Sequence, residues 1–180
     1  MAFDRAKERC AISMAIGEDD EIFAVLKAAS ELPPNTGNDV IAVGGGVLTR
    51  GVFADLYGVI AGRQLVPSTY LLHPRKYADI QKWDSTDLDQ VSLNVLVETG
   101  QYGVLFGSRL IVSTRLPQGT GTNRVYCTTT PDKLGRIPER KAVEVKIFDN
   151  VNDTAYNIVA WEQIGIGIFN PAGVARTADF

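Results

Sequence analysis

The sequence predicts an α+β fold in which a long helix comes first, a mixed α/β lobe follows, and antiparallel strands complete the chain. Three observations predict this order. Residues 2–30 place apolar side chains at helical spacing. Between about residues 41 and 130, short apolar strand patterns alternate with turns and helical patterns, which is typical of an α/β lobe. From Ser92 onward the chain is β in character, with glycines marking the turns.

The composition limits the classes of function. The chain has 180 residues, of which 45% are hydrophobic and 22% charged, which suits one folded domain or two small lobes. Its 18 Lys and Arg residues and 21 Asp and Glu residues are interspersed and give a net charge of −3. A general nucleic-acid binder carries a basic excess, so this class is disfavoured.

Cysteine content and hydropathy indicate the compartment. Cys10 and Cys127 are enough for one disulfide, but without a CxxC motif we expect two free thiols in a reducing cytoplasm. No apolar run approaches the ~18 residues of a membrane span. The charged start, Met1 to Arg5, also lacks the apolar core of a signal peptide. We therefore expect no membrane partner.

Gly17, followed by the acidic residues 18–21, predicts a break or a restart in the helix of residues 2–30. Acidic side chains suit a helix N-terminus because the helix dipole favours negative charge there. A calcium loop is the alternative, and it is disfavoured because such loops need spaced oxygen ligands around a turn glycine. A helix that begins at the first residue without a cap is typical of an element whose upstream partner is missing.

A glycine-rich turn leads into the second predicted helix. Residues 32–38 form a loop, residues 40–43 a short strand, and Gly44–Gly46 follow. Three glycines before a helix invite a phosphate-binding interpretation, but the Walker and dinucleotide patterns are both incomplete. We favour a flexible turn with Thr49 as the N-cap of a helix over residues 50–63. An α/β anion- or nucleotide-binding domain that uses this turn stays open as the alternative.

The single histidine lies at a strand-to-helix junction. Residues 68–73 predict a buried strand that ends at Pro74, and a short helix follows over residues 75–83. His73 has no Cys, Asp or Glu at ligand spacing, and no nucleophile elbow accompanies it. We therefore expect its imidazole to bond locally, and we predict no metal site and no cofactor.

The second half of the chain is read as strands and turns. Strand candidates lie at residues 93–97, 110–113 and 124–127. Residues 117–123 are predicted to be a hairpin or a mobile surface loop. Polar and apolar residues alternate over residues 142–148, as on a half-exposed strand, and residues 156–161 are expected to pair with them as a hairpin.

Residues 164–168 alternate isoleucine and glycine, which predicts a strand with isoleucines on one face and glycines on the other. Strand glycines are tolerated where another backbone approaches closely. We therefore expect a helix or a second chain against the face of Gly165 and Gly167, and bulky residues there to disrupt the fold. Asn170 and Pro171 are expected to end the strand because proline has no ladder donor.

Three segments, in order, resemble the major capsid proteins of tailed bacteriophages with the Hong Kong 97 fold. The first is LLHPRKYADI at residues 71–80, a strand that ends in a His-Pro pair before a helix. The second is GQYGVLFGSRLIVS at residues 100–113, which is similar to a glycine-punctuated segment of that family. The third is EQIGIGIFNP at residues 162–171, which resembles its near-terminal strand and stop.

The resemblance implies a structural shell protein, not an enzyme, that forms pentamers and hexamers of an icosahedral phage head around the genome. It implies an axial domain, a mixed sheet with flanking helices, over residues 43–130. It also implies a peripheral domain, in which a spine helix within residues 1–42 packs on an antiparallel sheet within residues 131–180. The chain would reside in the virion after assembly in the host cytoplasm, with packaged DNA met only through the shell interior.

The resemblance also implies where assembly contacts lie and what partners they have. We expect structural or assembly roles, and no catalytic roles, for eight residues: His73, Pro74, Gly119, Gly121, Gly165, Gly167, Asn170 and Pro171. The family's N-terminal arm and extended loop have no counterpart in this sequence, so we expect weak, concentration-dependent association. A separate arm segment, scaffold or portal proteins are candidate partners. An encapsulin-like compartment shell is the alternative within the same fold.

Overall fold

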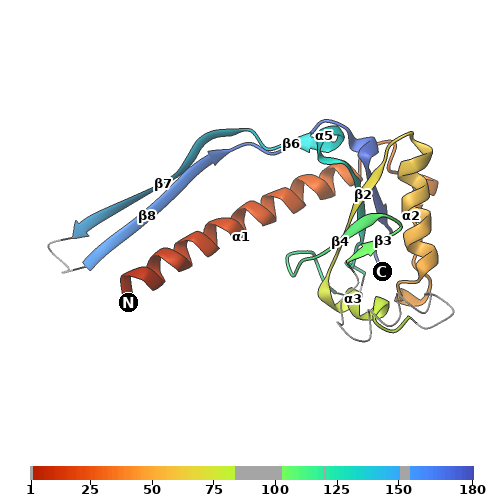
Figure 1. Cartoon of the computed structure of the whole chain (residues 1–180), viewed down its shortest axis with the longest axis horizontal. Helices are drawn as coiled ribbons and strands as arrows, with labels where there is room; N and C mark the ends of the chain where they lie inside the picture. The colour runs from red at the N-terminus through yellow and green to blue at the C-terminus, as the bar shows by residue number, and fades with distance from the viewer. Residues whose placement is uncertain (1, 84–102, 120, 151–154) are drawn as a thin grey trace.

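The computed structural model describes residues 2–83, 103–119, 121–150 and 155–180. A compact body contains a twisted sheet, and a long helix and a two-stranded ribbon extend from it side by side (Figure 1). The helices are α1 (Ala2–Ser30), α2 (Arg50–Gly62), α3 (Pro74–Ile80) and α5 (Pro131–Leu134), with short 3-10 turns η1 (Gly37–Asp39), η2 (Gly44–Gly46) and η3 (Pro171–Gly173). The strands are β1 (Val40–Ile41), β2 (Pro67–Leu72), β3 (Val104–Leu105), β4 (Ser108–Val112), β5 (Tyr126–Thr129), β6 (Gly135–Arg136), β7 (Glu139–Asn150), β8 (Ala155–Ile164), β9 (Gly167–Ile168) and β10 (Val174–Thr177).

The body is built on a six-stranded mixed sheet. Its strand order is β1-β10-β5-β2-β4-β3. β2 is parallel to β4, whereas β5 is antiparallel to both β2 and β10. The predicted α+β class and the mixed sheet are therefore confirmed. The expected strand at residues 93–97 lies outside the described residues.

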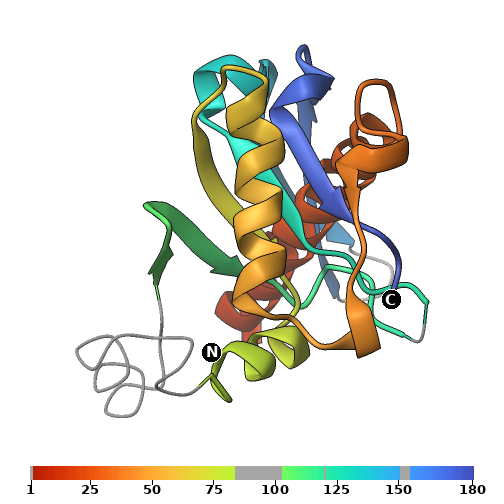
Figure 2. The same cartoon turned by 90° about the vertical axis from the view of Figure 1, so that its right-hand side faces the viewer.

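Two apolar clusters occupy opposite faces of this sheet. Helix α2 covers one face (Figure 2), and its Phe53 packs edge-on against Tyr70 of β2 with ring centroids 5.2 Å apart. On the other face, Leu26 near the end of α1 packs against Tyr126 and Val174. Successive residues of β5 alternate between the clusters because a strand points its side chains to alternate faces.

Helix α1 is continuous over 29 residues, so the predicted break at Gly17 is wrong. A single glycine costs a helix only about 1 kcal/mol and leaves its backbone hydrogen bonds intact. A β-carbon at Gly17 would meet no atom within 4 Å. The helix therefore passes through this exposed residue without needing a packing partner.

Strands β7 and β8 form the predicted hairpin. Val145 pairs with Ala160, and Lys146 with Val159. Within the described residues the ribbon pairs with no further strand and joins the body through the short pair β6 and β9. The side chains of Val143 and Val145 remain 53% and 51% exposed.

The expected isoleucine–glycine strand is interrupted, and its packing differs from the prediction. β8 ends at Ile164 and β9 begins at Gly167. A β-carbon at Gly165 would lie 3.3 Å from Cγ of Pro138, and one at Gly167 would lie 3.6 Å from the ring of Phe169. Ile164, Ile166 and Ile168 line the hollows against α1, and Gly167 also borders one of them. The nearest neighbours of the two glycines are not residues of α1, so the expected helix against the glycine face is not found, and a second chain there stays a prediction. The larger, apolar isoleucine face gains more from covering.

The six-stranded sheet does not follow the expected domain boundaries at residues 42/43 and 130/131. β1 precedes the first boundary and β10 follows the second, yet both strands lie in the sheet of the body. β10 is held there by antiparallel pairing with β5, as in the Val174–Thr128 and Arg176–Tyr126 pairs. The division into axial and peripheral domains stays a prediction.

Candidate functional site

His73 and the proline that follows it have local structural roles. His73 is the N-cap of α3, where its Nδ1 accepts a hydrogen bond from the Arg75 backbone N–H at 3.2 Å. Burial and the charge of Arg75 lower the pKa of His73, which favours the neutral acceptor. Pro74 is the first residue of α3, where its missing N–H costs nothing. The predicted local bond is therefore confirmed.

The glycine turn η2 is satisfied by the protein's own groups. Gly45 and Gly46 have φ of 66° and 70°, which glycine adopts easily. The Leu48 N–H beyond them donates to Asp79 Oδ2 at 3.2 Å, and Lys76 Nζ donates to the Gly46 carbonyl at 2.8 Å. A buried carboxylate therefore already occupies the donor that follows the turn, which disfavours the anion-binding alternative.

Within the described residues, no group of three or more His, Cys, Asp or Glu side chains is placed to hold a metal ion. In the same part of the chain, no helix has the length and apolarity to cross a bilayer.

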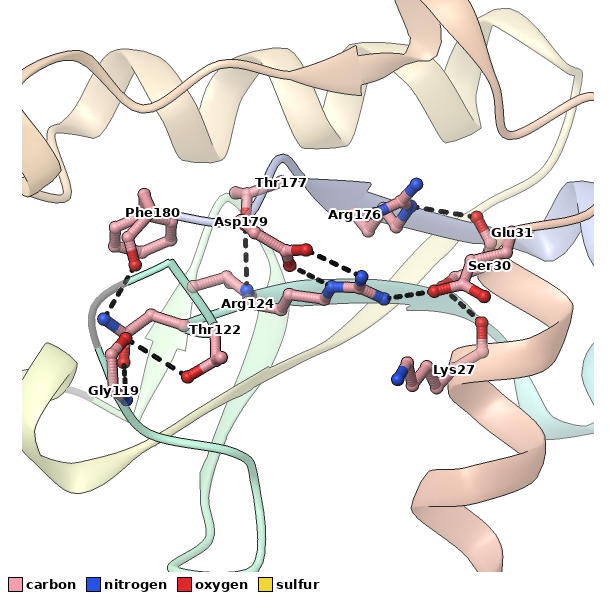
Figure 3. A network of polar contacts seen from close by, with 12 residues as sticks. Lys27, Ser30, Glu31, Gly119, Thr122, Arg124, Arg176, Thr177, Asp179 and Phe180 are labelled. Atoms are coloured by element: carbon pink, nitrogen blue, oxygen red, sulfur yellow. Dashed lines mark hydrogen bonds and ion pairs between the residues drawn. The ribbon is translucent and has the colours of Figure 1, made fainter.

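A dense polar network lies where α1 meets the body, and we call it the Arg124 joint: Glu31, Arg124, Arg176 and Asp179 (Figure 3). Arg124 Nη1 donates to Glu31 Oε1 at 2.8 Å. Its Nε and Nη2 donate to the two carboxylate oxygens of Asp179, the latter at 2.9 Å. Such a bidentate pair fixes both position and plane. The joint thus ties the helix end to the C-terminal residues.

The charges of the joint shift the pKa values of its members. The hydrogen bond from Arg124 lowers the pKa of Glu31 and that of Asp179, and Arg176 and Lys27 act in the same direction. The hydrogen bond to Asp179 raises the pKa of Arg124. Both carboxylates therefore stay ionised, and the joint keeps its charge, until the pH falls below their ordinary range.

Side chains of the body donate hydrogen bonds to the carbonyl groups at the end of α1. Arg176 Nε donates to the Ser30 carbonyl at 3.0 Å, and Asn35 Nδ2 donates to the Ala29 carbonyl at 3.0 Å. A cation at a helix C-terminus is favoured by the helix dipole. Polar capping and the apolar contacts of Leu26 therefore act together on the same end of the helix.

The loop of residues 117–123 is attached to the same network. Asn123 Nδ2 donates to the Phe180 carbonyl at 2.8 Å, and the Phe180 N–H donates to the Asn123 carbonyl at 3.3 Å. Thr122 N–H closes a turn onto the Gly119 carbonyl at 3.1 Å, and Gly121 has a φ of 74° that suits glycine. The described part of the loop is a turn, not a strand hairpin.

The sequence-predicted residues lie in separate places. His73 and Pro74 lie at the start of α3, whereas Gly165 and Gly167 lie where the ribbon meets the body. Pro171 opens η3 just beyond β9, so the predicted stop of that strand is confirmed. Sequence reasoning missed Arg124 because its partners are 93 and 55 residues away and carry no spacing signal.

The ribbon and α1 leave an apolar hollow of about 490 Å³ between them. It is lined by Lys7, Cys10, Ala11, Met14, Val143, Val145 and Ala160. An isolated two-stranded hairpin is marginally stable in water and needs further strands or a packed face. The hollow, the exposed valines and the ribbon edges that are unpaired within the described residues are together typical of a surface for association.

A family model described as "Phage capsid protein" matches residues 1–177. Among solved structures, the chain is similar to one titled "Mycobacterium phage Che8", with a TM-score of 0.71 at 14% identity, covering 98% of this chain and 62% of that one. It is also similar to the mature capsid of bacteriophage PhiM1, with a TM-score of 0.61 at 12% identity, covering 97% of this chain and 64% of that one. A third similar structure is the SrpI encapsulin complex of Synechococcus elongatus, with a TM-score of 0.60 at 15% identity, covering 97% of this chain and 64% of that one.

No curated protein matches the sequence. The chain spans less than two thirds of the length of these structural neighbours. At such low identities the neighbours show the fold, which is the Hong Kong 97 type. The family match over nearly the whole sequence gives the assignment: the chain belongs to the phage capsid protein family.

Proposed function

We propose that this chain is a structural subunit of a phage head, which associates with copies of itself into pentamers and hexamers and has no enzymatic activity. The observation that supports this most directly is the extension formed by α1 and the β7–β8 ribbon. Its valines are exposed and its strand edges are unpaired within the described residues. Neighbouring subunits would cover those valines and pair those edges.

We assign the two lobes of the subunit as follows. The axial lobe is the body of residues 43–130 together with β1 and β10, and it would surround the five- and six-fold axes. The loop of residues 117–123, with Gly119 and Gly121, would lie near those axes. The peripheral lobe is α1 with the β6–β9 region, including Asn170. In the virion, the shell interior would face the packaged DNA.

Association of this chain alone is expected to be weak. About a third of each structural neighbour has no counterpart in it, so a share of inter-subunit area would be absent. An arm or loop segment, scaffold and portal proteins are the partners that would supply it. An encapsulin-like compartment shell uses the same fold, but the family match favours the phage shell.

The test is light scattering coupled to size exclusion over a wide concentration range, with negative-stain imaging of any large peak. Rings of five or six, or closed shells, support the proposal. A monomer at every concentration, also after mixing with the remaining capsid gene products, would overturn it.

A matched pair of variants locates the contact. Val143→Glu together with Val145→Glu places charge in the hollow and is expected to abolish the large species. Val66→Glu is the control, because Val66 is 59% exposed on the body, outside the extension. If both variants assemble alike, the extension is not the interface.

A further inference from the structure

Helix α1 meets the body only through its last turns. Its buried side chains, within the described residues, are Leu26, Ala29 and Ser30. The rest of the helix projects from the body (Figure 1). At ~1.5 Å per residue, the 29-residue helix is ~43 Å long, so a rotation of ~10° at its base moves its far end by ~7 Å. Small freedom at the base therefore becomes a large displacement.

Arg124 lies where the end of α1 meets the C-terminal residues and the loop of residues 117–123. Its side chain is only 11% exposed. One nitrogen holds Glu31 at the end of α1, and two others hold Asp179. Phe180, the next residue, accepts a hydrogen bond from the Asn123 side chain through its carbonyl and donates one through its N–H to the Asn123 carbonyl.

We propose that Arg124 is a positioning residue that couples the direction of α1 to the conformation of the described part of the loop, residues 117–119 and 121–123. The guanidinium is planar and rigid, so it cannot follow a movement of Glu31 without rotating against Asp179. Asp179 in turn is one residue from the backbone that holds Asn123. In a shell, which rests on the proposed function, this link would connect the peripheral lobe to the loop near the axis.

The competing explanation is that the apolar contacts of Leu26 with Tyr126 and Val174 alone set the direction of α1. The variant Glu31→Gln separates the two, because it removes the ionic link and leaves those contacts intact. Glu8→Gln is the matched control, since it makes the same change of charge on an exposed part of α1 far from the joint.

The first measurement is a spin-label distance distribution on the monomer. One label is attached to the native Cys10 of α1 and the other to Ala54→Cys on the exposed side of α2. Cys127 is fully buried and stays unlabelled. Glu31→Gln is expected to broaden the distribution, because Cys10 lies ~30 Å from the joint and moves by ~5 Å for each ~10° of rotation. A width equal to that of wild type and Glu8→Gln would overturn the proposal.

The second measurement tests the coupling itself through amide hydrogen exchange at Phe180. Glu31→Gln and Asp179→Asn are each expected to speed its exchange by about two- to fivefold, the range that partly exposed ion pairs support. In the double variant the second change is expected to add less than it does alone. Unchanged exchange at Phe180 in folded Glu31→Gln would overturn the coupling. Both readouts use the monomer, so their outcome does not depend on whether the chain assembles.

Discussion

An alanine at Gly135 is expected to force apart the two short strands that attach the ribbon to the body. Gly135 of β6 lies opposite Ile168 of β9. Its β-carbon would overlap the carbonyl oxygen of Gly167 and lie 3.0 Å from Cα of Ile168. Because both are backbone atoms, no change of side-chain rotamer relieves the overlap.

The magnitude follows from the steric overlap and from the smaller freedom of the unfolded chain, without any backbone strain. Gly135 has φ −176° and ψ −172°, an extended conformation that alanine adopts as easily as glycine. Overpacking costs about 1–3 kcal/mol, and reduced freedom of the unfolded chain offsets about 0.4–1 kcal/mol of this. We expect the free energy of unfolding to fall by about 1–2 kcal/mol. For a domain of this size that corresponds to a Tm lower by about 2–8 °C.

The assay is thermal unfolding followed by circular dichroism, with urea unfolding as a second measure. Gly167→Ala is the control on the opposite strand, because its β-carbon would make only an ordinary 3.6 Å contact with the Phe169 ring. The control is expected to keep the wild-type Tm or to exceed it slightly. If Gly135→Ala melts with or above Gly167→Ala, the steric reasoning is refuted.

Three further outcomes are expected. Arg63→Met should lower the free energy of unfolding in urea by about 1–3 kcal/mol, because it leaves partly buried acceptors in the 34–39 loop and η3 without their donor. An unchanged urea midpoint would contradict this. In a thiol titration at pH 8, Cys10 should react in the native protein, whereas Cys127 should react only in denaturant. The reason is that burial raises the pKa of the Cys127 thiol to about 12. Two thiols that react fast in the native protein would contradict the burial of Cys127. Desolvation raises the pKa of the Glu162 carboxyl, and Glu18 acts in the same direction. The stability contributed by the protonated carboxyl is therefore lost as the pH rises through that pKa. Glu162→Gln should raise the Tm at pH 7 but not below about pH 4.

Elements with strong local signals are predicted well from the sequence. The apolar spacing of α2 places Phe53, Leu56 and Ile60 in the core, as expected. The His73–Pro74 pair correctly marks the start of α3 because both residues act within one turn of the chain. The β7–β8 hairpin follows from the polar–apolar alternation of residues 142–148 and from the expected pairing of residues 156–161 with them.

Features that depend on distant parts of the chain are not predicted. The return of β10 into the sheet of the body depends on pairing with β5, which leaves no periodic trace. Among the described glycines the most crowded is Gly135, not the conspicuous Gly165 or Gly167 of the isoleucine–glycine alternation. Crowding is a property of the opposing strand, and the sequence around a glycine does not report it.

The extension is attached to the body at two places of different chemistry. Charged and polar groups around Arg124 hold the end of α1, whereas short backbone pairing between β6 and β9 holds the ribbon. Salt and acid weaken the first attachment and leave backbone pairing largely unaffected. The helix and the ribbon are therefore attached to the body by different groups, although Glu18 of α1 and Glu162 of β8 also link them to each other, and the hollow lies between them. In the proposed shell, a subunit that occupies both five- and six-fold surroundings would need some freedom between helix and ribbon, and neighbours that cover the hollow would remove it.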